Sequence, residues 1–191
     1  MPSYKIIIGD HDCEFLEGLK FRLSGLSHNV LDTDTSGPSL LRKIRSLNPD
    51  IVIVEANMKG MTGFEIADIL EGEGICPCII SFKGEASQYR IALSSKKTKA
   101  YLKKPIDYNE LDYILNQSIR DFDFMLKEEK KKKEKKIIDK AKKMLMDKYS
   151  IDEEKAYTYI RKKSMEKKTT MYKISLLLID ILKANKEGIS K

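Results

Sequence analysis

The chain has 191 residues, enough for one large domain or two small ones, and its 41% hydrophobic and 34% charged residues are typical of a folded globular protein. No apolar run reaches the roughly 20 residues that cross a bilayer, and the start MPSYKIIIGDHD turns acidic too early for a signal peptide, so we expect a cytoplasmic protein. Three cysteines and two histidines exclude a disulfide framework and leave little for zinc. We interpret Cys13, Cys76 and Cys78 as reduced packing residues.

The net charge of +7 is distributed unevenly along the chain. Residues 1–126 carry 15 Lys and Arg against 18 Asp and Glu, a net charge of −3, whereas residues 127–191 carry 21 against 11, a net charge of +10. A basic segment attracts polyanions such as nucleic acid. A solvated, lysine-rich surface explains the same charge equally well, so charge alone leaves both interpretations open.

Short apolar runs alternate with segments of helical periodicity over the first two thirds of the chain. The expected strands are residues 4–9, 28–32, 51–54, 78–82 and 99–102, and the expected helices are residues 15–26, 39–47, 64–70, 89–94 and from 109 onward. The run IVIV at 51–54 is apolar at every position, which is typical of a strand covered on both faces. Five strands alternating with five helices predict an α/β fold with a doubly wound five-stranded parallel sheet.

The helix that begins near residue 109 has no clear end in the sequence. Its apolar stripe consists of Leu111, Leu115, Ile119 and Phe122. The charged run KEEKKKKEKK at 127–136 follows without glycine or proline, so we expect one long linking helix that continues to about residue 148. Its part at 109–136 could pair with a second copy of the chain as a coiled coil, which makes a homodimer the expected assembly. A disordered charged linker is the alternative.

The remaining segment predicts three amphipathic helices. Asp152 is the expected N-cap of the second helix, and Thr169 or Thr170 opens the third. The apolar face of the third helix consists of Met171, Ile174, Leu177, Leu178 and Ile181. Because short helices with one apolar face must pack on one another or on a partner, we expect a C-terminal three-helix bundle at 137–187, after a first domain at 1–125.

Polar side chains follow the predicted strands at one edge of the sheet. They are Asp10, His11, Asp12, Glu55, Asn57, Ser81 and Lys104. Ligands of doubly wound sheets bind at the carboxyl ends of the strands, so these side chains are the candidate site of the first domain.

This arrangement, with PDIVIV, GMTG and YLKKP at matching spacings, resembles the receiver domain of bacterial response regulators over about residues 3–125. In that family an acidic pair holds Mg²⁺, an aspartate after the third strand accepts phosphate, and a Lys-Pro pair contacts the phosphoryl group. The resemblance implies that Asp10 is the first acid, that Asn57 offers its backbone carbonyl to the metal, and that Lys104 is the lysine. It also implies that Tyr101 is the aromatic residue that reports the state of the domain.

The sequence departs from the receiver pattern at the positions that carry the chemistry. Glu55 stands where the phosphoaccepting aspartate belongs, His11 stands where the second acid belongs, and Phe82 occupies the Thr or Ser position. A carboxylate one methylene longer cannot keep the same oxygen in line with a phosphate donor, so we expect a receiver that is not phosphorylated. Either Glu55 imitates the phosphorylated state or the site has decayed and the domain is a scaffold. No cofactor is expected, although Mg²⁺ at Asp10 and Asp12 stays open.

The C-terminal segment is similar to the ANTAR domain of transcription antitermination regulators over about residues 134–186. The matching pieces are AK at 141–142, MLM at 144–146, EKAY at 154–157, IR at 160–161 and SM at 164–165. The resemblance implies binding of RNA hairpins through their loops. The candidate RNA-binding residues are Lys140, Lys142, Lys143, Arg161, Lys162, Lys167 and Lys168. Tyr157 or Tyr159 could stack on a base, although tyrosine at helical spacing is more often a core residue.

Together these resemblances predict an RNA-binding transcription antiterminator of the two-component type, which stabilises hairpins in leader RNA and is not an enzyme. A DNA-binding regulator is one alternative, although no glycine occurs between Gly84 and Gly188 to form the turn of a helix-turn-helix. A protein-interaction scaffold with a solvated basic tail is the other.

Overall fold

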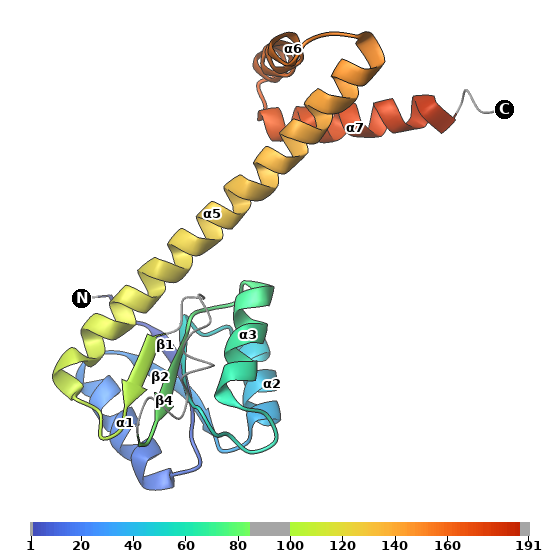
Figure 1. Ribbon diagram of the computed structural model, residues 1–191. Coiled ribbons are helices and arrows are strands. Elements are labelled where there is room, and N and C mark those ends of the chain that lie inside the picture. Colours follow the sequence, from blue (N-terminus) through green and yellow to red (C-terminus); the bar gives the residue numbers. More distant parts are fainter. Residues whose placement is uncertain (1, 85–99, 188–191) are drawn as a thin grey trace. The chain divides into compact units, whose positions relative to one another are not determined.

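The computed structural model describes residues 2–84 and 100–187, and the chain divides into two compact units, Met1–Leu126 and Lys127–Lys191 (Figure 1). The predicted helix at 89–94 lies outside the described residues. Within the described ranges, no helix combines the length and the apolar character needed to cross a membrane.

The first unit is built on a parallel sheet of five strands in the order β2-β1-β3-β4-β5. The strands are β1 Lys5–Gly9, β2 Asn29–Asp34, β3 Ile51–Glu55, β4 Cys78–Phe82 and β5 Ala100–Lys103. The register places Glu55 of β3 opposite Ser81 of β4, so the carboxyl ends of the central strands meet at one edge. The predicted doubly wound sheet is confirmed.

Helices cover both faces of this sheet. They are α1 Cys13–Gly25, α2 Gly37–Leu47, α3 Gly63–Glu73 and α5 Tyr108–Tyr149. Val52 and Val54 pack into a core cluster with α2 and α3, whereas Ile51 and Ile53 pack into a second cluster with α1 and α5. The alternation of β3 between the two clusters explains why the run IVIV is apolar at every position.

The apolar stripe of α5 belongs to the core of the first unit. Leu111 and Leu115 are 0% exposed, Phe122 is buried and Ile119 packs against the second core cluster. This corrects the expectation that these four residues are available to a second copy. Spacing at three and four residues identifies the buried face of a helix, but it does not say what buries it.

The predicted long helix is confirmed, because α5 continues through the charged run to Tyr149. Glutamate and lysine are good helix formers and nothing in the run breaks the helix. Its exposed apolar residues in the first unit are Tyr113 and Phe124, each 66% exposed.

The second unit packs the last part of α5 against α6 Glu153–Glu166 and α7 Met171–Glu187. Its core consists of Ala141, Leu145, Ala156, Ile160, Ile174, Ile179 and Leu182. Asp152 is the N-cap of α6 as predicted, since its carboxylate accepts a hydrogen bond from Lys155 N at 2.8 Å. The predicted apolar face of α7 was partly wrong: Leu177 and Ile181 lie exposed, and Ile179 and Leu182 fill the core instead.

Candidate functional site

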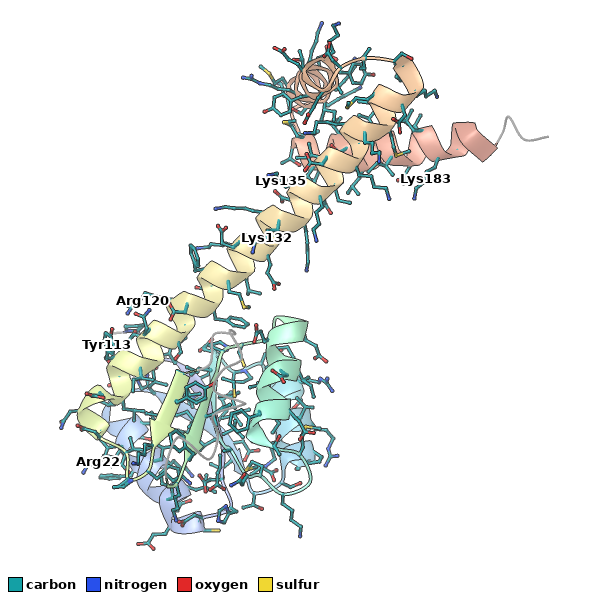
Figure 2. The ribbon with its side chains drawn as sticks, viewed as in Figure 1. Arg22, Tyr113, Arg120, Lys132, Lys135 and Lys183 are labelled. Carbon is teal, nitrogen blue, oxygen red and sulfur yellow. The ribbon has the colours of Figure 1, made fainter. Side chains whose placement is uncertain are left out.

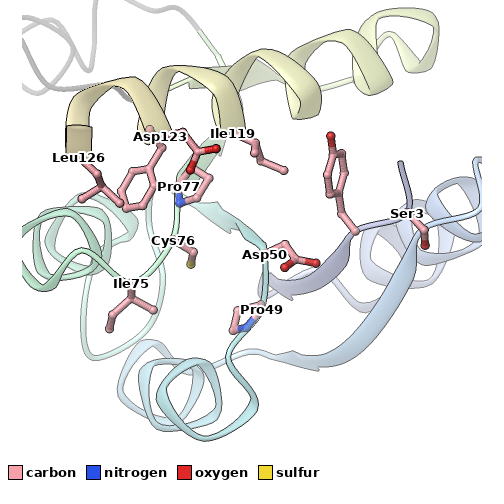
Figure 3. Close-up of a pocket in the computed structure, with 11 residues that line it drawn as sticks. Ser3, Pro49, Asp50, Ile75, Cys76, Pro77, Ile119, Asp123 and Leu126 are labelled. Carbon is pink, nitrogen blue, oxygen red and sulfur yellow. The ribbon is translucent and has the colours of Figure 1, made fainter. Parts of the chain in front are cut away.

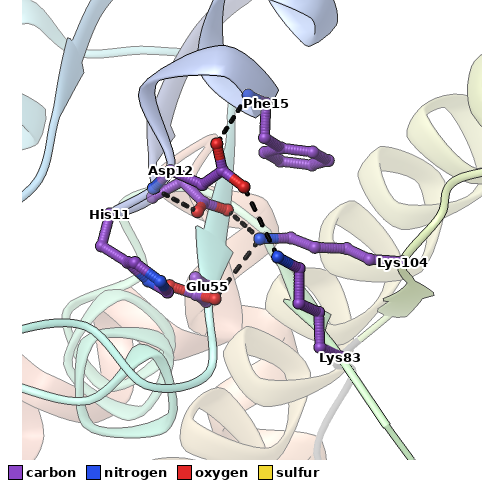
Figure 4. A network of polar contacts seen from close by, with 7 residues as sticks. His11, Asp12, Phe15, Glu55, Lys83 and Lys104 are labelled. Atoms are coloured by element: carbon purple, nitrogen blue, oxygen red, sulfur yellow. Dashed lines mark hydrogen bonds and ion pairs between the residues drawn. The ribbon is translucent and has the colours of Figure 1, made fainter.

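Four polar side chains meet at the carboxyl edge of the sheet (Figure 4). Lys104 Nζ, which follows β5, lies 2.5 Å from Asp10 Oδ2 and 3.3 Å from Glu55 Oε1, and all three side chains are buried. His11 Nδ1 contacts the other oxygen of the same carboxylate, Glu55 Oε2. Both Glu55 oxygens therefore have cationic or hydrogen-bonding partners within the protein.

The surroundings of this network hold its members in place. The ring of Phe15 lies over Lys104, with Nζ 4.0 Å from the ring centroid, which favours the ammonium by a cation–π interaction. A Cβ atom at Gly63 would lie 2.4 Å from the backbone oxygen of Glu55. Glycine at the start of α3 thus allows this helix to approach the end of β3.

Asp12 has a structural task beside the network. Its carboxylate accepts a hydrogen bond from Phe15 N at 3.1 Å as the N-cap of α1, and Lys83 Nζ lies 3.4 Å from its other oxygen. The hydrogen bond from Phe15 holds the pKa of Asp12 below its ordinary value, and Lys83 lowers it further. The carboxylate is thus engaged in capping, and Asp12 is not among the potential metal ligands that lie together at this edge, which are Asp10, His11 and Glu55.

The other predicted site residues of the first unit lie around this edge. The Ser81 hydroxyl on β4 is buried, as is the Tyr101 hydroxyl on β5, and neither has a hydrogen-bond partner among the described residues. The side chain of Tyr101 packs against the first core cluster, and burial raises the pKa of its phenol. Asn57 lies exposed just beyond β3.

Most of the predicted RNA-binding residues are exposed cations of the second unit. The exposed members are Lys140, Lys143, Arg161, Lys162, Lys167 and Lys168. Arg161 and Lys162 lie on α6, and Lys167 and Lys168 lie in the turn that follows it, so four of these exposed candidates lie within eight residues. Figure 2 shows Lys132 and Lys135, which the sequence interpretation did not single out, extending from the middle of α5.

Lys142 differs from the other candidates. Its side chain is only 14% exposed, and Nζ lies 2.7 Å from Asp139 Oδ1 and 2.7 Å from Glu153 Oε1. These hydrogen bonds raise the pKa of Lys142 above its ordinary value. Lys142 therefore ties α5 to α6, and this corrects its interpretation as a free phosphate-binding lysine.

The tyrosines of α6 lie at the surface and not in the core, with Tyr157 44% exposed and Tyr159 43% exposed. Tyr157 and Met171 are among the residues that line a shallow pocket of about 350 Å³ between the helices of the second unit. Lysines of α5 line the same pocket, including Lys131 and Lys135. An exposed aromatic ring beside cations is a surface on which an unpaired base can stack.

Comparison with known families identifies both units. The sequence model of the response regulator receiver domain matches residues 6–116, more than half of the chain. The chain belongs to this family. The model of the ANTAR domain matches residues 129–179, so the receiver domain is followed by an ANTAR domain.

Two curated relatives differ in how far the similarity extends. A response regulatory protein of Staphylococcus epidermidis is 27% identical over 115 residues, which covers 59% of this chain and 45% of the relative. The transcriptional regulatory protein PdtaR of Mycobacterium tuberculosis is 21% identical over 190 residues, which covers 96% of this chain and 93% of PdtaR. The chain thus spans less than half of the first relative and nearly the whole length of the second.

Solved structures match the receiver domain. The receiver domain of a modulated diguanylate cyclase from Desulfovibrio desulfuricans gives a TM-score of 0.58 at 21% identity, covering 65% of this chain and 99% of that chain. A two-component transcriptional regulator AraC from Clostridium phytofermentans gives a TM-score of 0.54 at 26% identity, and the match covers 63% of this chain and 95% of that chain. The sheet and its helices therefore have the receiver fold.

Receiver domains use Mg²⁺, but the residues of this site do not fit that ion. Mg²⁺ requires near-octahedral coordination by oxygen. Here the position of the second acid holds the imidazole of His11, so the group offers Mg²⁺ a nitrogen ligand in place of a carboxylate oxygen.

A cavity of the receiver domain, of about 480 Å³, lies at the end of the sheet opposite to the polar network (Figure 3). Cys76 is one of the residues that line it, together with Pro49 and Pro77 from the loops before β3 and β4 and Ile119 from α5. Burial raises the pKa of the Cys76 thiol to about 12, so the thiol stays protonated. This agrees with the interpretation of Cys76 as a packing residue.

Proposed function

We propose that this protein is an RNA-binding transcription antiterminator of the response-regulator type. The observation that carries the proposal is the ANTAR domain at 129–179, whose exposed cations gather on α6 and the turn after it. ANTAR domains are RNA-binding modules, and phosphate contacts from lysine and arginine supply affinity and salt dependence. The similarity to PdtaR over nearly the whole chain supports a role as a transcriptional regulator and not as an enzyme.

Gel-shift titrations with a two-hairpin leader RNA and a matched DNA duplex test this function. The affinity for RNA is expected to exceed that for DNA at physiological salt and to fall by roughly 0.7 to 0.9 log units per phosphate contact for each log unit of salt. Replacement of both Lys167 and Lys168 by alanine is expected to weaken binding. The exposed Lys5 and Lys20 provide the matched control, since replacing both by alanine removes two cations outside the ANTAR domain. Equal affinity for RNA and DNA would contradict the antiterminator and favour a DNA-binding regulator.

We further propose that the receiver domain is not phosphorylated and that Glu55 imitates the phosphorylated state. Glu55 Oε1 lies 3.3 Å from Lys104, the lysine that contacts the phosphoryl group in the receiver pattern. The resemblance implies that Tyr101 is the aromatic residue that reports the state of the domain, and its hydroxyl is buried. The division of the chain into a receiver domain at 1–125, a linking helix at 109–136 and an ANTAR domain at 137–187 stays a prediction.

Dimerisation through α5 is also a proposal, with a contact surface other than the predicted one. Tyr113 and Phe124 are 11 residues apart, about three helical turns, and therefore lie on the same side of α5. Arg120 lies exposed on this side between them (Figure 2). A second copy that packs on this side of α5 would cover both of these exposed apolar side chains. A second copy of the same helix is the proposed partner.

A further inference from the structure

Three potential metal ligands lie together at the carboxyl edge of the receiver sheet. Asp10, His11 and Glu55 each offer one ligand atom, and these three atoms lie within 4.8 Å of one another. The two carboxylates are buried, whereas the side chain of His11 is 60% exposed. The group is therefore fixed from within the domain and open to solvent on the imidazole side, where an ion could enter and keep water ligands.

The chemistry of this group differs from that of an acidic magnesium site. One imidazole nitrogen with two carboxylate oxygens is a set that suits Zn²⁺, Fe²⁺ and Ni²⁺, whereas Mg²⁺ prefers oxygen ligands alone. We propose that Asp10, His11 and Glu55 form a binding site for a divalent transition-metal ion, for which Zn²⁺ is the probe, and that this site does not select Mg²⁺. This proposal rests on the receiver domain alone and is independent of RNA binding.

Lys104 competes with the metal ion but does not block it. Its ammonium contacts Asp10 Oδ2 and Glu55 Oε1, one oxygen of each carboxylate. An ionised carboxylate has about four acceptor positions, so each can serve a lysine and a metal ion together. The contact between His11 and Glu55 Oε2 is the one that metal binding would replace.

Other potential ligands can be separated from this site. Cys13 is exposed and only two residues from His11, so its thiol is a rival ligand for Zn²⁺. His28 is buried, stacks on Tyr4 and lies 3.3 Å from Asp112, which keeps it apart from the three ligands. The experiment therefore uses the full chain with Cys13→Ser as its background.

Isothermal titration calorimetry with Zn²⁺ and with Mg²⁺ tests the site. The Cys13→Ser protein is expected to bind one Zn²⁺ ion per chain and to bind Mg²⁺ more weakly. His11→Ala and Glu55→Gln are each expected to weaken Zn²⁺ binding by about tenfold or more. Glu14→Gln, which removes an exposed carboxylate of α1 outside the group, is the control and is expected to leave Zn²⁺ binding unchanged.

His11→Asp provides a reciprocal test of the ligand chemistry. An aspartate restores an all-oxygen set, so this variant is expected to gain Mg²⁺ affinity while it loses Zn²⁺ affinity. Circular dichroism of each variant verifies that the receiver domain is folded, and the exposure of His11 makes its replacement compatible with folding. Zn²⁺ binding that is unchanged in both His11→Ala and Glu55→Gln, or tighter binding of Mg²⁺ than of Zn²⁺ by the Cys13→Ser protein, would overturn the proposal.

Discussion

Glu55 stands at the position of the phosphoaccepting aspartate in the receiver pattern. Its carboxylate is one methylene longer than aspartate, and both of its oxygens contact other side chains, Lys104 and His11. Phosphoryl transfer depends on an oxygen placed in line with the donor. These two contacts support the proposal that the receiver domain is not phosphorylated.

The first prediction concerns phosphorylation at Glu55. Incubation of the wild-type protein with acetyl phosphate and Mg²⁺ is expected to give no phosphorylated species, whereas Glu55→Asp is expected to give weak phosphorylation, because Asp10 and Lys104 remain in place. Intact-mass spectrometry measures both. Full recovery is not expected, since His11 and Phe82 still replace residues of the receiver pattern. A phosphorylated wild-type receiver carboxylate would contradict the proposed unphosphorylated receiver.

The second prediction concerns Asp12 and acid. Because the pKa of Asp12 is lowered in the folded chain, its contribution to stability is present above its ordinary value of 3.8 and is lost as the pH falls through the lower folded value. Asp12→Ala is expected to lower the unfolding temperature at neutral pH and to have a smaller effect near about pH 2. Thermal unfolding followed by circular dichroism measures the difference. An equal decrease in the unfolding temperature at both pH values would show that the ionised carboxylate of Asp12 does not stabilise the fold.

At the scale of the helices and strands, the sequence pattern predicts which side chains are buried, but it does not predict which other part of the protein covers them. The uninterrupted apolar run predicts that Ile51, Val52 and Ile53 pack on both faces of the sheet, and these residues alternate between the two core clusters. The apolar stripe containing Leu115 was also predicted from its helical spacing. That spacing alone does not show whether the stripe packs in the receiver core or against a second copy of the chain. The role of Lys142 depends on Asp139 and on Glu153 of the next helix, a contact between α5 and α6 that no local pattern contains.

The candidate site was predictable for a related reason. Strand ends bring distant residues together once the parallel order of the strands is known, so Asp10, Glu55 and Lys104 were found from the sequence. The capping role of Asp12 was missed because the helix was expected to begin at residue 15, whereas it begins at Cys13, directly after Asp12. The proposed metal group of Asp10, His11 and Glu55 was not expected from the sequence, because two histidines in the chain leave little for zinc.

The third prediction separates the two faces of α5. Leu115→Ala is expected to destabilise the receiver domain by about 2 to 5 kcal/mol, the usual cost of a cavity in a core. Phe124→Glu is expected to leave stability nearly unchanged, because the side chain is exposed, and to weaken dimerisation. Chemical denaturation measures the first effect, and analytical ultracentrifugation over a range of concentrations measures the second. A wild-type protein that stays monomeric at all concentrations would contradict the proposed dimer.

At the scale of the whole molecule, the receiver and ANTAR domains share α5, whose residues belong to the cores of both. Leu115 is part of the receiver core, and Leu145 is part of the ANTAR core. Because one helix contributes to both cores, a change in the receiver domain could alter RNA binding by the ANTAR domain. Coupling between them is a free energy that can be measured by changing one domain and reading the other.

The fourth prediction uses Glu55→Gln to measure this coupling. The amide keeps the size of the side chain and removes the charge that faces Lys104, so an imitated phosphorylated state is expected to be lost. We expect weaker RNA binding in gel-shift titrations and weaker dimerisation in ultracentrifugation, both from a change in the receiver domain alone. The exposed Glu14 gives a matched control, because Glu14→Gln removes a carboxylate of the same domain away from the network. A Glu55→Gln protein with wild-type RNA affinity and wild-type dimerisation would contradict phosphoryl imitation. That result would support a receiver that acts as a scaffold, because a scaffold depends on the fold and not on the charge at this edge of the sheet.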